Sequence, residues 1–335
     1  MRSKRLRIVF PYLILGACLL NTSSDTSSVR AQSPPPPDHP PEWASHRPPQ
    51  IASTQVLKIG GAELQVDFAV GALDLPTDQI LPWLNRAAQA VTVYYGHFPV
   101  SRDRILIVPV QDEHGVVQGT TWGDMRGMPA FTRIRLGQHT TVQDLADDWT
   151  MTHELVHNAF PSLPDDQHWM EEGLSTYVEP IARVQAGELK AAQIWHDMMD
   201  GMPKGEPRTG DRGLDNTHTW GRTYWGGGLF CLVADVNIRR QTHNRKGLRD
   251  ALRAIVAAGG TIDHEWPLMK ALEVGDKATG TTVLTDQYKQ WSQTPMPVDL
   301  PALWRELGVS EGPAGSATLD PHAPLAAIRD AIMAR

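Results

Sequence analysis

The stretch from His153 to Gly173, HELVHNAFPSLPDDQHWMEEG, constrains the fold of this chain more than any other. Its first five residues, HELVH, place two histidines four positions apart, so both imidazoles project from one face of a helix, about 40° apart around its axis. Two neutral ring nitrogens in this arrangement can hold one zinc ion. The intervening Glu154 is offset by about 100° on the same turn, beside the metal but not bound to it. A general base for a water activated by zinc needs that position.

A catalytic zinc ion usually takes three protein ligands and one water, so a third ligand is expected downstream of His157. The metzincin continuation is excluded, because it needs a Gly three residues and a His six residues after the second histidine. Phe160 and Leu163 stand at those positions. A carboxylate from a second helix remains as the third ligand.

The following residues predict a turn and then that second helix. Pro161 and Pro164 end the first helix and force a turn, and Asp165 or Asp166 can cap the next helix. Residues 169–179, WMEEGLSTYVE, form the predicted helix. The candidates for the third ligand are Glu172, Glu171, His168 and Asp166.

Residues 169–179 are similar to the pattern W-L-N-E-G-x-A-x-Y-V-E of the gluzincin peptidases, the peptidase MA-like group that contains thermolysin, aminopeptidase N and the glycyl aminopeptidases. In these families the third zinc ligand is the Glu directly before the Gly, which corresponds to Glu172. The resemblance therefore implies a zinc metallopeptidase with one Zn²⁺ per chain, held by His153, His157 and Glu172. It also implies that Glu154 is the general base of peptide-bond hydrolysis.

A second resemblance covers the segment from His218 to Thr242. Residues 224–228, YWGGG, and an apolar helix that ends in IRRQT are similar to the Y-x-x-G-A and I-R-x-x-T segments of aminopeptidase N and the glycyl aminopeptidases. In those families the Tyr donates a hydrogen bond to the oxyanion of the tetrahedral intermediate, which implies this role for Tyr224. The alternative is a tyrosine packed at the start of a helix. His218 and Arg222 precede it and are candidates to bind a carboxylate or carbonyl of the substrate.

Residues 1–31 have the pattern of a secretory signal. Four basic residues within the first seven precede a short apolar run, Ile8–Leu20, which is too short for a spanning helix. Two cleavage positions fit the sequence: a lipobox-like LGAC, which leaves a lipidated Cys18, and VRA ending at Ala31. We therefore expect an exported protein that is periplasmic, secreted or envelope-anchored. Contact with a membrane is expected only through a lipid on the N-terminus.

Charge and cysteine content limit the possible partners. The full chain has a formal net charge of −7, and removing residues 1–31, which hold five Arg/Lys and one Asp, leaves −11. An acidic body argues against nucleic acid as a partner. Cys18 and Cys231 are the two cysteines, so a mature chain that has lost or lipidated the first forms no internal disulfide.

Composition and periodicity divide the rest of the chain. Residues 33–49 contain eight prolines and few apolar residues, which predicts an extended linker over residues 32–53. Residues 54–137 predict a small α/β part, and residues 138–335 a mostly helical zinc-binding half. The resemblance implies an α+β, thermolysin-like zincin catalytic domain, in which a small mixed sheet precedes the zinc helix.

The expected elements follow from alternating or helical apolar patterns. The zinc helix is expected to start at Thr140 or Thr141 and to continue through Val156, and Thr77 or Asp78 is expected to cap an earlier helix. The expected strands are Val56–Ile59, Ala62–Val70, Ile105–Val110, Val116–Trp122 and Phe131–Leu136. The expected helices include Thr77 to about Tyr95, Leu229–Arg240, Lys246–Ala258, His264–Val274, Gly280–Trp291 and Ala323–Met333.

In gluzincins an edge strand of this sheet pairs with the substrate backbone. That edge is expected around Gly119–Asp124, which makes Gly119 and Trp122 candidate substrate contacts; the alternative is an ordinary hairpin. Aminopeptidase N relatives recognise the substrate amine through a Gly-x-Met-Glu-Asn stretch, and nothing in this sequence matches it. The sequence therefore leaves open whether peptides are trimmed from an end or cut internally.

The expected function is zinc-dependent hydrolysis of a peptide or protein substrate. Two other functions fit parts of the pattern: a non-catalytic envelope binding module with a retained zinc site, and a zinc hydrolase of non-peptide amides or epoxides. Glu154 and Tyr224 argue against the binding module, because a structural zinc site needs neither and is usually closed by a fourth ligand.

Overall fold

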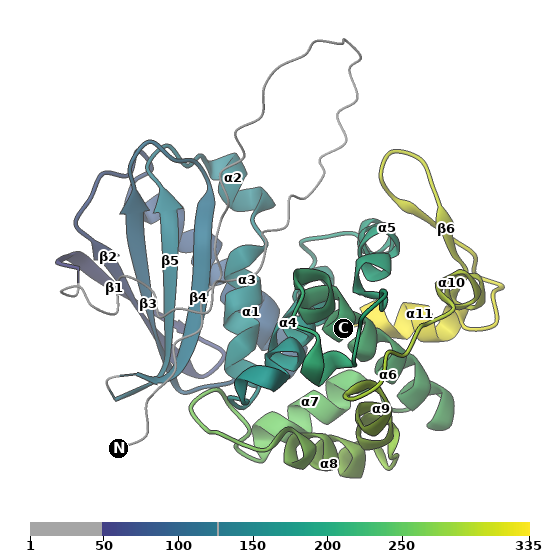
Figure 1. Cartoon of the computed structure of the whole chain (residues 1–335). Coiled ribbons are helices and arrows are strands. Elements are labelled where there is room, and N and C mark those ends of the chain that lie inside the picture. The colour runs from purple at the N-terminus through teal and green to yellow at the C-terminus, as the bar shows by residue number, and fades with distance from the viewer. Residues whose placement is uncertain (1–48, 126) are drawn as a thin grey trace.

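The computed structural model describes residues 49–125 and 127–335. The expected signal sequence, Cys18 and the expected linker up to residue 48 lie outside the described residues. The described chain has a five-stranded mixed sheet beside a mostly helical half (Figure 1). This arrangement confirms the α+β architecture with the sheet ahead of the helices.

The sheet has the strand order β1-β2-β3-β5-β4. β1 pairs antiparallel with β2, and β4 with β5, whereas β3 runs parallel to both of its neighbours. β4 is therefore an edge strand, as expected. All five expected strand regions are present, and β1 begins inside the expected linker. The strands are β1 (Ile51–Ile59), β2 (Ala62–Ala69), β3 (Arg102–Val110), β4 (Val116–Met125) and β5 (Met128–Gly137).

Helix α1 (Thr77–Tyr95) connects the parallel strands β2 and β3 and packs on the inner face of the sheet. Ile80 and Leu84 on the helix and Ile105 on β3 are completely buried in the shared core. The expected cap at Thr77 or Asp78 was wrong. The N-cap residue is Pro76, which makes no side-chain hydrogen bond to the helix, and its fixed φ suits the entry into a helix.

The expected continuous zinc helix is interrupted at Asp148. α2 (Val142–Asp147) starts after Thr141, which forms a capping box with the third residue of the helix, and α3 (Thr150–Val156) starts anew. The Asp148 carboxylate accepts hydrogen bonds of 3.0 Å from the backbone N–H groups of Thr150 and Met151. Asp148 therefore satisfies the free donors at the start of α3, and this local bond breaks the helix that the apolar period predicted.

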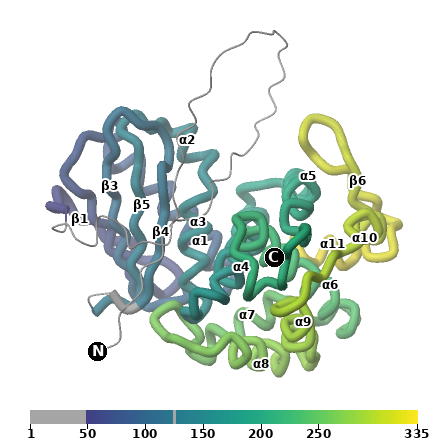
Figure 2. Tube along the Cα trace, viewed as in Figure 1, coloured from purple at the N-terminus to yellow at the C-terminus, as the bar shows by residue number. Residues whose placement is uncertain are grey.

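The helical half follows along the chain from α3 to the C-terminus, and Figure 2 traces its path. The two 3₁₀ turns between α3 and α4 are His157–Ala159 and Asp165–Gln167. Gln167 is the N-cap residue of α4, and its side chain makes no capping hydrogen bond to the helix. The expected cap at Asp165 or Asp166 was therefore wrong. The helices are α4 (His168–Gln185), α5 (Ala191–Gly201), α6 (Gly227–Gln241), α7 (Leu248–Ala257), α8 (Leu268–Thr279), α9 (Val283–Trp291), α10 (Leu300–Leu307) and α11 (Ala326–Met333).

Helix α5 and the short hairpin of β6 (Val309–Glu311) and β7 (Ala317–Leu319) were not expected from the sequence. Cys231 is a free cysteine in α6 and is buried in the core. Between residue 49 and the C-terminus, the described helices include none with the length and apolar character needed to cross a bilayer.

Candidate metal centre

The two motif histidines lie at the end of α3, on its side facing α4. His153 and Glu154 are buried, at 2% and 1% exposure, and the side chain of His157 is 10% exposed. The two imidazole centroids are 5.1 Å apart. The helix therefore places both rings together, and His157 leaves the site an opening to solvent.

Glu172 on α4 completes the cluster. Its Oε2 lies 3.1 Å from Nε2 of His153 and 3.7 Å from Nε2 of His157. One ligand atom from each of these three residues lies within 4.8 Å of the other two. Within the described residues, no other group of three His, Cys, Asp or Glu side chains meets this criterion with one ligand atom from each residue.

The glycine after Glu172 explains how α4 reaches its position. A Cβ on Gly173 would stand 2.2 Å from the Cα of Gly227, which opens α6. The two helices therefore pack backbone against backbone, and any side chain at Gly173 would push α4 away from α6. Glu172 directly precedes Gly173, and the turn that holds Tyr224 directly precedes Gly227. The close contact between the two glycines therefore brings Glu172 and Tyr224 near each other.

The charges of the cluster suit a divalent cation. Burial alone would raise the pKa of Glu172, but His157, His153 and His168 hold that pKa well below its usual range. Burial opposes charge on His153, yet the hydrogen bond to Glu172 and the nearby carboxylates raise its pKa. The ionised Glu172 carboxylate and the imidazoles of His153 and His157 form a set of ligands that suits zinc. Zinc would take the place of the proton that an imidazole binds in its absence.

The other candidates for the third ligand have different positions. Glu171 turns away from the motif: its Oε1 accepts a 3.1 Å hydrogen bond from the backbone of Leu163, and its Oε2 lies 3.1 Å from Nδ1 of His168. Asp166 is exposed in the turn before α4. Among the four candidates, Glu172 is therefore the one that the fold brings to both motif histidines.

Glu154 points from α3 toward the edge strand β4. Thr121 on that strand donates a 2.8 Å hydrogen bond to Oε2 of Glu154. Gly119 lies so close that an added Cβ would stand 2.6 Å from the Cγ of Glu154. Burial raises the pKa of Glu154 to about 7, against the opposing effects of His153 and Thr121. The carboxyl group is therefore poised to exchange a proton near neutral pH.

Tyr224 also belongs to the site. It lies in a π-helical turn, Gly221–Gly226, directly before α6, and such turns frequently occur at functional sites. Its ring stacks on His153, with centroids 6.2 Å apart, and its hydroxyl hydrogen-bonds the carboxylate of Glu172. Burial and the two nearby glutamates raise its pKa well above the usual value. The phenol therefore keeps its proton and can donate it in a hydrogen bond.

Two of the expected substrate contacts lie elsewhere. Trp122 faces the opposite side of β4 from Thr121, where its ring stacks on Phe131 with centroids 5.6 Å apart. Arg222 is buried, with an ion pair of 2.7 Å to Asp211 and a bond to the carbonyl of Gly205. Both side chains are thus engaged in packing within the fold. Trp122 points away from the site because consecutive side chains of a strand lie on opposite faces. No local sequence pattern indicates that Arg222 pairs with Asp211.

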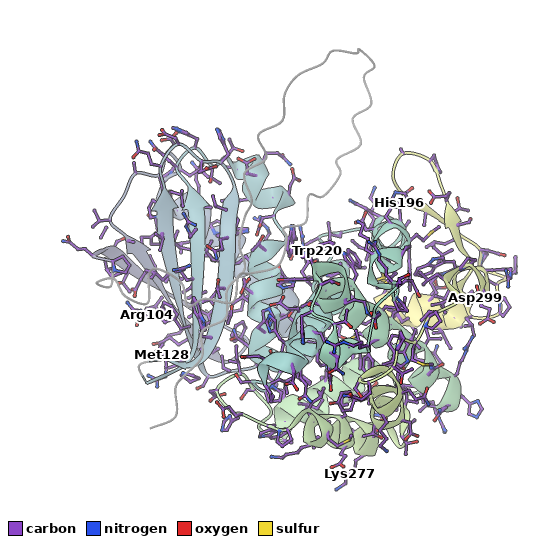
Figure 3. The ribbon with its side chains drawn as sticks, viewed as in Figure 1. Arg104, Met128, His196, Trp220, Lys277 and Asp299 are labelled. Carbon is purple, nitrogen blue, oxygen red and sulfur yellow. The ribbon has the colours of Figure 1, made fainter. Side chains whose placement is uncertain are left out.

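His218 is exposed in the loop before the π-helical turn. Trp220 is partly buried, and its ring stacks on Tyr224 with centroids 6.0 Å apart. In Figure 3, Trp220 lies on the part of the helical half that is nearer the sheet. Sequence reasoning missed Thr121 and Trp149, whose ring meets His153 edge-on at 5.3 Å. Alternation along β4 from Gly119 would have indicated Thr121, because residues two apart share a face.

No protein-family model and no curated protein sequence matches this chain. Among solved structures, an aminopeptidase N family protein from Idiomarina loihiensis matches with a TM-score of 0.56 at 14% identity, covering 77% of this chain and 49% of that chain. An M1 zinc metallopeptidase from Deinococcus radiodurans gives a TM-score of 0.46 at 14% identity, covering 75% and 52%. A variant of that enzyme bound to a Tyr-Ser-Ala substrate gives 0.47 at 14% identity, covering 74% and 53%.

The chain thus spans about half the length of the structures it matches. The first match confirms the gluzincin resemblance at the level of the fold: the described chain has the α+β fold found in part of an aminopeptidase N family protein.

Proposed function

We propose that this protein is a zinc-dependent metallopeptidase that hydrolyses peptide bonds. The observation that carries the proposal is the position of Glu154: a buried carboxyl group that lies beside the His153–His157–Glu172 cluster, outside its ligand set, and bonds to the edge strand β4. A site that only stabilises a fold has no use for such a group.

His153, His157 and Glu172 would hold the zinc ion. When bound, zinc would supply Lewis acidity to the scissile carbonyl and make a water nucleophilic near neutral pH. The end of α3 carries the two imidazoles and α4 carries the Glu172 carboxylate, and the Gly173–Gly227 contact supports the position of α4.

The protein's own groups carry the protons. Glu154, with its pKa near 7, accepts a proton from the attacking water and returns it to the leaving amine. Thr121 holds the acceptor oxygen of Glu154 in a fixed orientation. Tyr224 keeps its hydroxyl proton and donates a hydrogen bond to the carbonyl oxygen as negative charge develops there.

The edge strand β4 supplies a place for the substrate backbone. Its inner neighbour is β5, so the backbone groups along its other edge are not used by the sheet. An extended peptide that pairs with this edge would pass Gly119 and Thr121, the two residues that contact Glu154. Pairing through the backbone would hold the scissile bond beside the general base.

The proposal is tested by measuring zinc content and cleavage of a mixed peptide library for the wild type and for Glu154→Gln. Both proteins should bind one zinc ion, and the variant should lose at least about 100-fold in turnover. Glu63→Gln, at an exposed position of β2, is the matched control and should cut normally. Normal turnover by Glu154→Gln would refute the mechanism. Zinc binding without any cleavage by the wild type would favour the binding-module alternative.

A further inference from the structure

His168, the first residue of α4, lies between two carboxylates of its own helix. Its Nε2 is 3.1 Å from Oε1 of Glu172, and its Nδ1 is 3.1 Å from Oε2 of Glu171. The three residues are spaced so that the ring meets both acids from the same face of the helix. Two neighbouring glutamates, which would otherwise repel each other, thus share one imidazole.

The two oxygens of Glu172 have separate partners. Oε2 faces the motif histidines, at 3.1 Å from Nε2 of His153 and 3.7 Å from Nε2 of His157. Oε1 faces Nε2 of His168, and the hydroxyl of Tyr224 also donates a hydrogen bond to this carboxylate. The carboxylate is therefore held from behind while it presents one oxygen to the cluster.

The contact continues to the backbone of the turn before α4. Glu171 bonds to His168 through one oxygen, and its other oxygen accepts a 3.1 Å hydrogen bond from the N–H of Leu163. Both glutamates are 3% exposed at the side chain, and His168 is 23% exposed. The orientation of Glu172 is thus coupled through His168 and Glu171 to the backbone of Leu163, and both carboxylates are shielded from water.

We infer that His168 is a positioning residue of the metal centre, which holds Oε1 of Glu172 so that the carboxylate binds zinc through Oε2 alone. This inference rests on the zinc site of the proposed function. A residue that bonds to a metal ligand from outside orients it, and its loss typically costs about 10- to 100-fold in metal affinity. His168 itself is not a ligand, because its Nε2 faces the oxygen of Glu172 that is turned away from the motif histidines.

The experiment compares His168→Asn with His168→Gln. A Gln amide nitrogen stands near the position of the ring Nε2 and can still reach Glu172, whereas an Asn amide nitrogen corresponds to Nδ1 and reaches only toward Glu171. Both replacements are polar and fit a partly exposed helix start. His196→Asn is the matched control, because His196 on α5 pairs with two exposed acids, Asp200 and Glu311.

Zinc affinity is measured by competition with a chelator, and the visible spectrum is recorded after substitution with Co²⁺. His168→Asn should bind zinc about 10- to 100-fold more weakly than the wild type and show shifted cobalt bands, because Glu172 changes its binding mode. His168→Gln and His196→Asn should keep the wild-type affinity and spectrum. Thermal unfolding of the metal-free proteins checks that each variant folds.

Each contrary result is distinct. Equal zinc affinity and equal cobalt spectra for His168→Asn and the wild type would overturn the inference and leave the peptidase proposal intact. Loss of zinc binding in both His168 variants, with normal folding, would make His168 a ligand and would also overturn it. A wild type that binds no zinc would defeat the proposed function itself.

Discussion

Thr121 on the edge strand β4 donates a 2.8 Å hydrogen bond to Oε2 of Glu154 on α3. The hydroxyl of Thr121 also lies 3.3 Å from the hydroxyl of Thr132 on β5, which in turn donates to Asp103 on β3 at 3.0 Å. A line of buried polar groups therefore crosses three strands and ends on the proposed general base. The sheet fixes the orientation of Glu154 as well as supporting its helix.

Replacing Thr121 with Val should slow peptide hydrolysis without releasing zinc. The change removes one hydrogen bond to a carboxylate and keeps the shape of the side chain, so kcat should fall by about tenfold or more. Zinc content and kcat are the measurements. Thr120→Val is the matched control, because Thr120 faces the other side of the strand and its hydroxyl bonds to the adjacent backbone carbonyl of Gly119. Equal losses in both variants would assign the effect to the strand as a whole.

The same variant should shift the pH dependence of the reaction. The bond from Thr121 lowers the pKa of Glu154, which burial raises to about 7. Without that bond the pKa rises further, and Glu154 becomes ionised only at higher pH. The acid limb of the kcat/KM profile should therefore move upward in pH in Thr121→Val and stay in place in Thr120→Val.

Gly119→Ala should abolish most of the activity. The new Cβ would stand 2.6 Å from Cγ and 2.7 Å from Oε1 of Glu154, closer than van der Waals contact, so the carboxylate must move. We expect kcat to fall by about 100-fold, with the three zinc ligands and the zinc content unchanged. Gly228→Ala is the control, because its nearest neighbour would be Thr176 at 3.6 Å and its helix should gain stability. A fully active Gly119→Ala protein would contradict the placement of Glu154.

Tyr224→Phe should lower kcat by about 100- to 1,000-fold and change KM little, because a donor to a developing oxyanion acts mainly in the transition state. The high pKa of Tyr224 means that the hydroxyl stays protonated throughout the working pH range. Steady-state kinetics on one cleaved peptide checks this. Tyr95→Phe removes a buried hydroxyl without a hydrogen-bond partner in the described structure, and should leave both constants unchanged. A Tyr224→Phe protein with raised KM and normal kcat would instead indicate a binding role.

The sequence predicted the helices and strands that carry the site, because apolar periodicity and the HELVH spacing are local signals. The third ligand followed from the resemblance of the α4 sequence to a known pattern. The break at Asp148 was missed, since a side chain that bonds to its own backbone leaves the apolar period intact.

Contacts between distant segments could not be predicted in the same way. Arg222 was a candidate for binding substrate, and its partner Asp211 became evident only from the folding of the loop before the π-helical turn. Trp122 was a candidate substrate contact because it lies on an edge strand. Side chains alternate between the two faces of a strand, however, and its ring stacks on Phe131 on the face opposite Glu154. The bond between Thr121 and Glu154 joins residues 33 positions apart, and no local pattern specifies such a pair.

Asp103 should make the stability of the fold depend on pH below neutrality. Burial raises the pKa of Asp103 from 3.8 to about 6, and the bonds from Asn158 and Thr132 only partly oppose this. Between these two values the folded state keeps a proton that the unfolded state has lost, so the free energy of unfolding falls as the pH rises. The contribution is about 3 kcal/mol, present below pH 4 and lost above pH 6.

Denaturant unfolding of the metal-free protein at pH 4 and pH 7 measures this contribution against Asp103→Asn, which cannot titrate. The wild type should lose about 3 kcal/mol more than the variant over that interval, because the other titrating groups are common to both proteins. Asn158→Asp is a useful companion, since a second carboxyl group beside Asp103 should raise its pKa and move the loss of stability to higher pH. The same pH dependence in the wild type and in Asp103→Asn would mean that the pKa of Asp103 lies near its ordinary value. The line of buried polar groups that ends on Glu154 would then contain an ionised Asp103 carboxylate over the whole interval from pH 4 to pH 7.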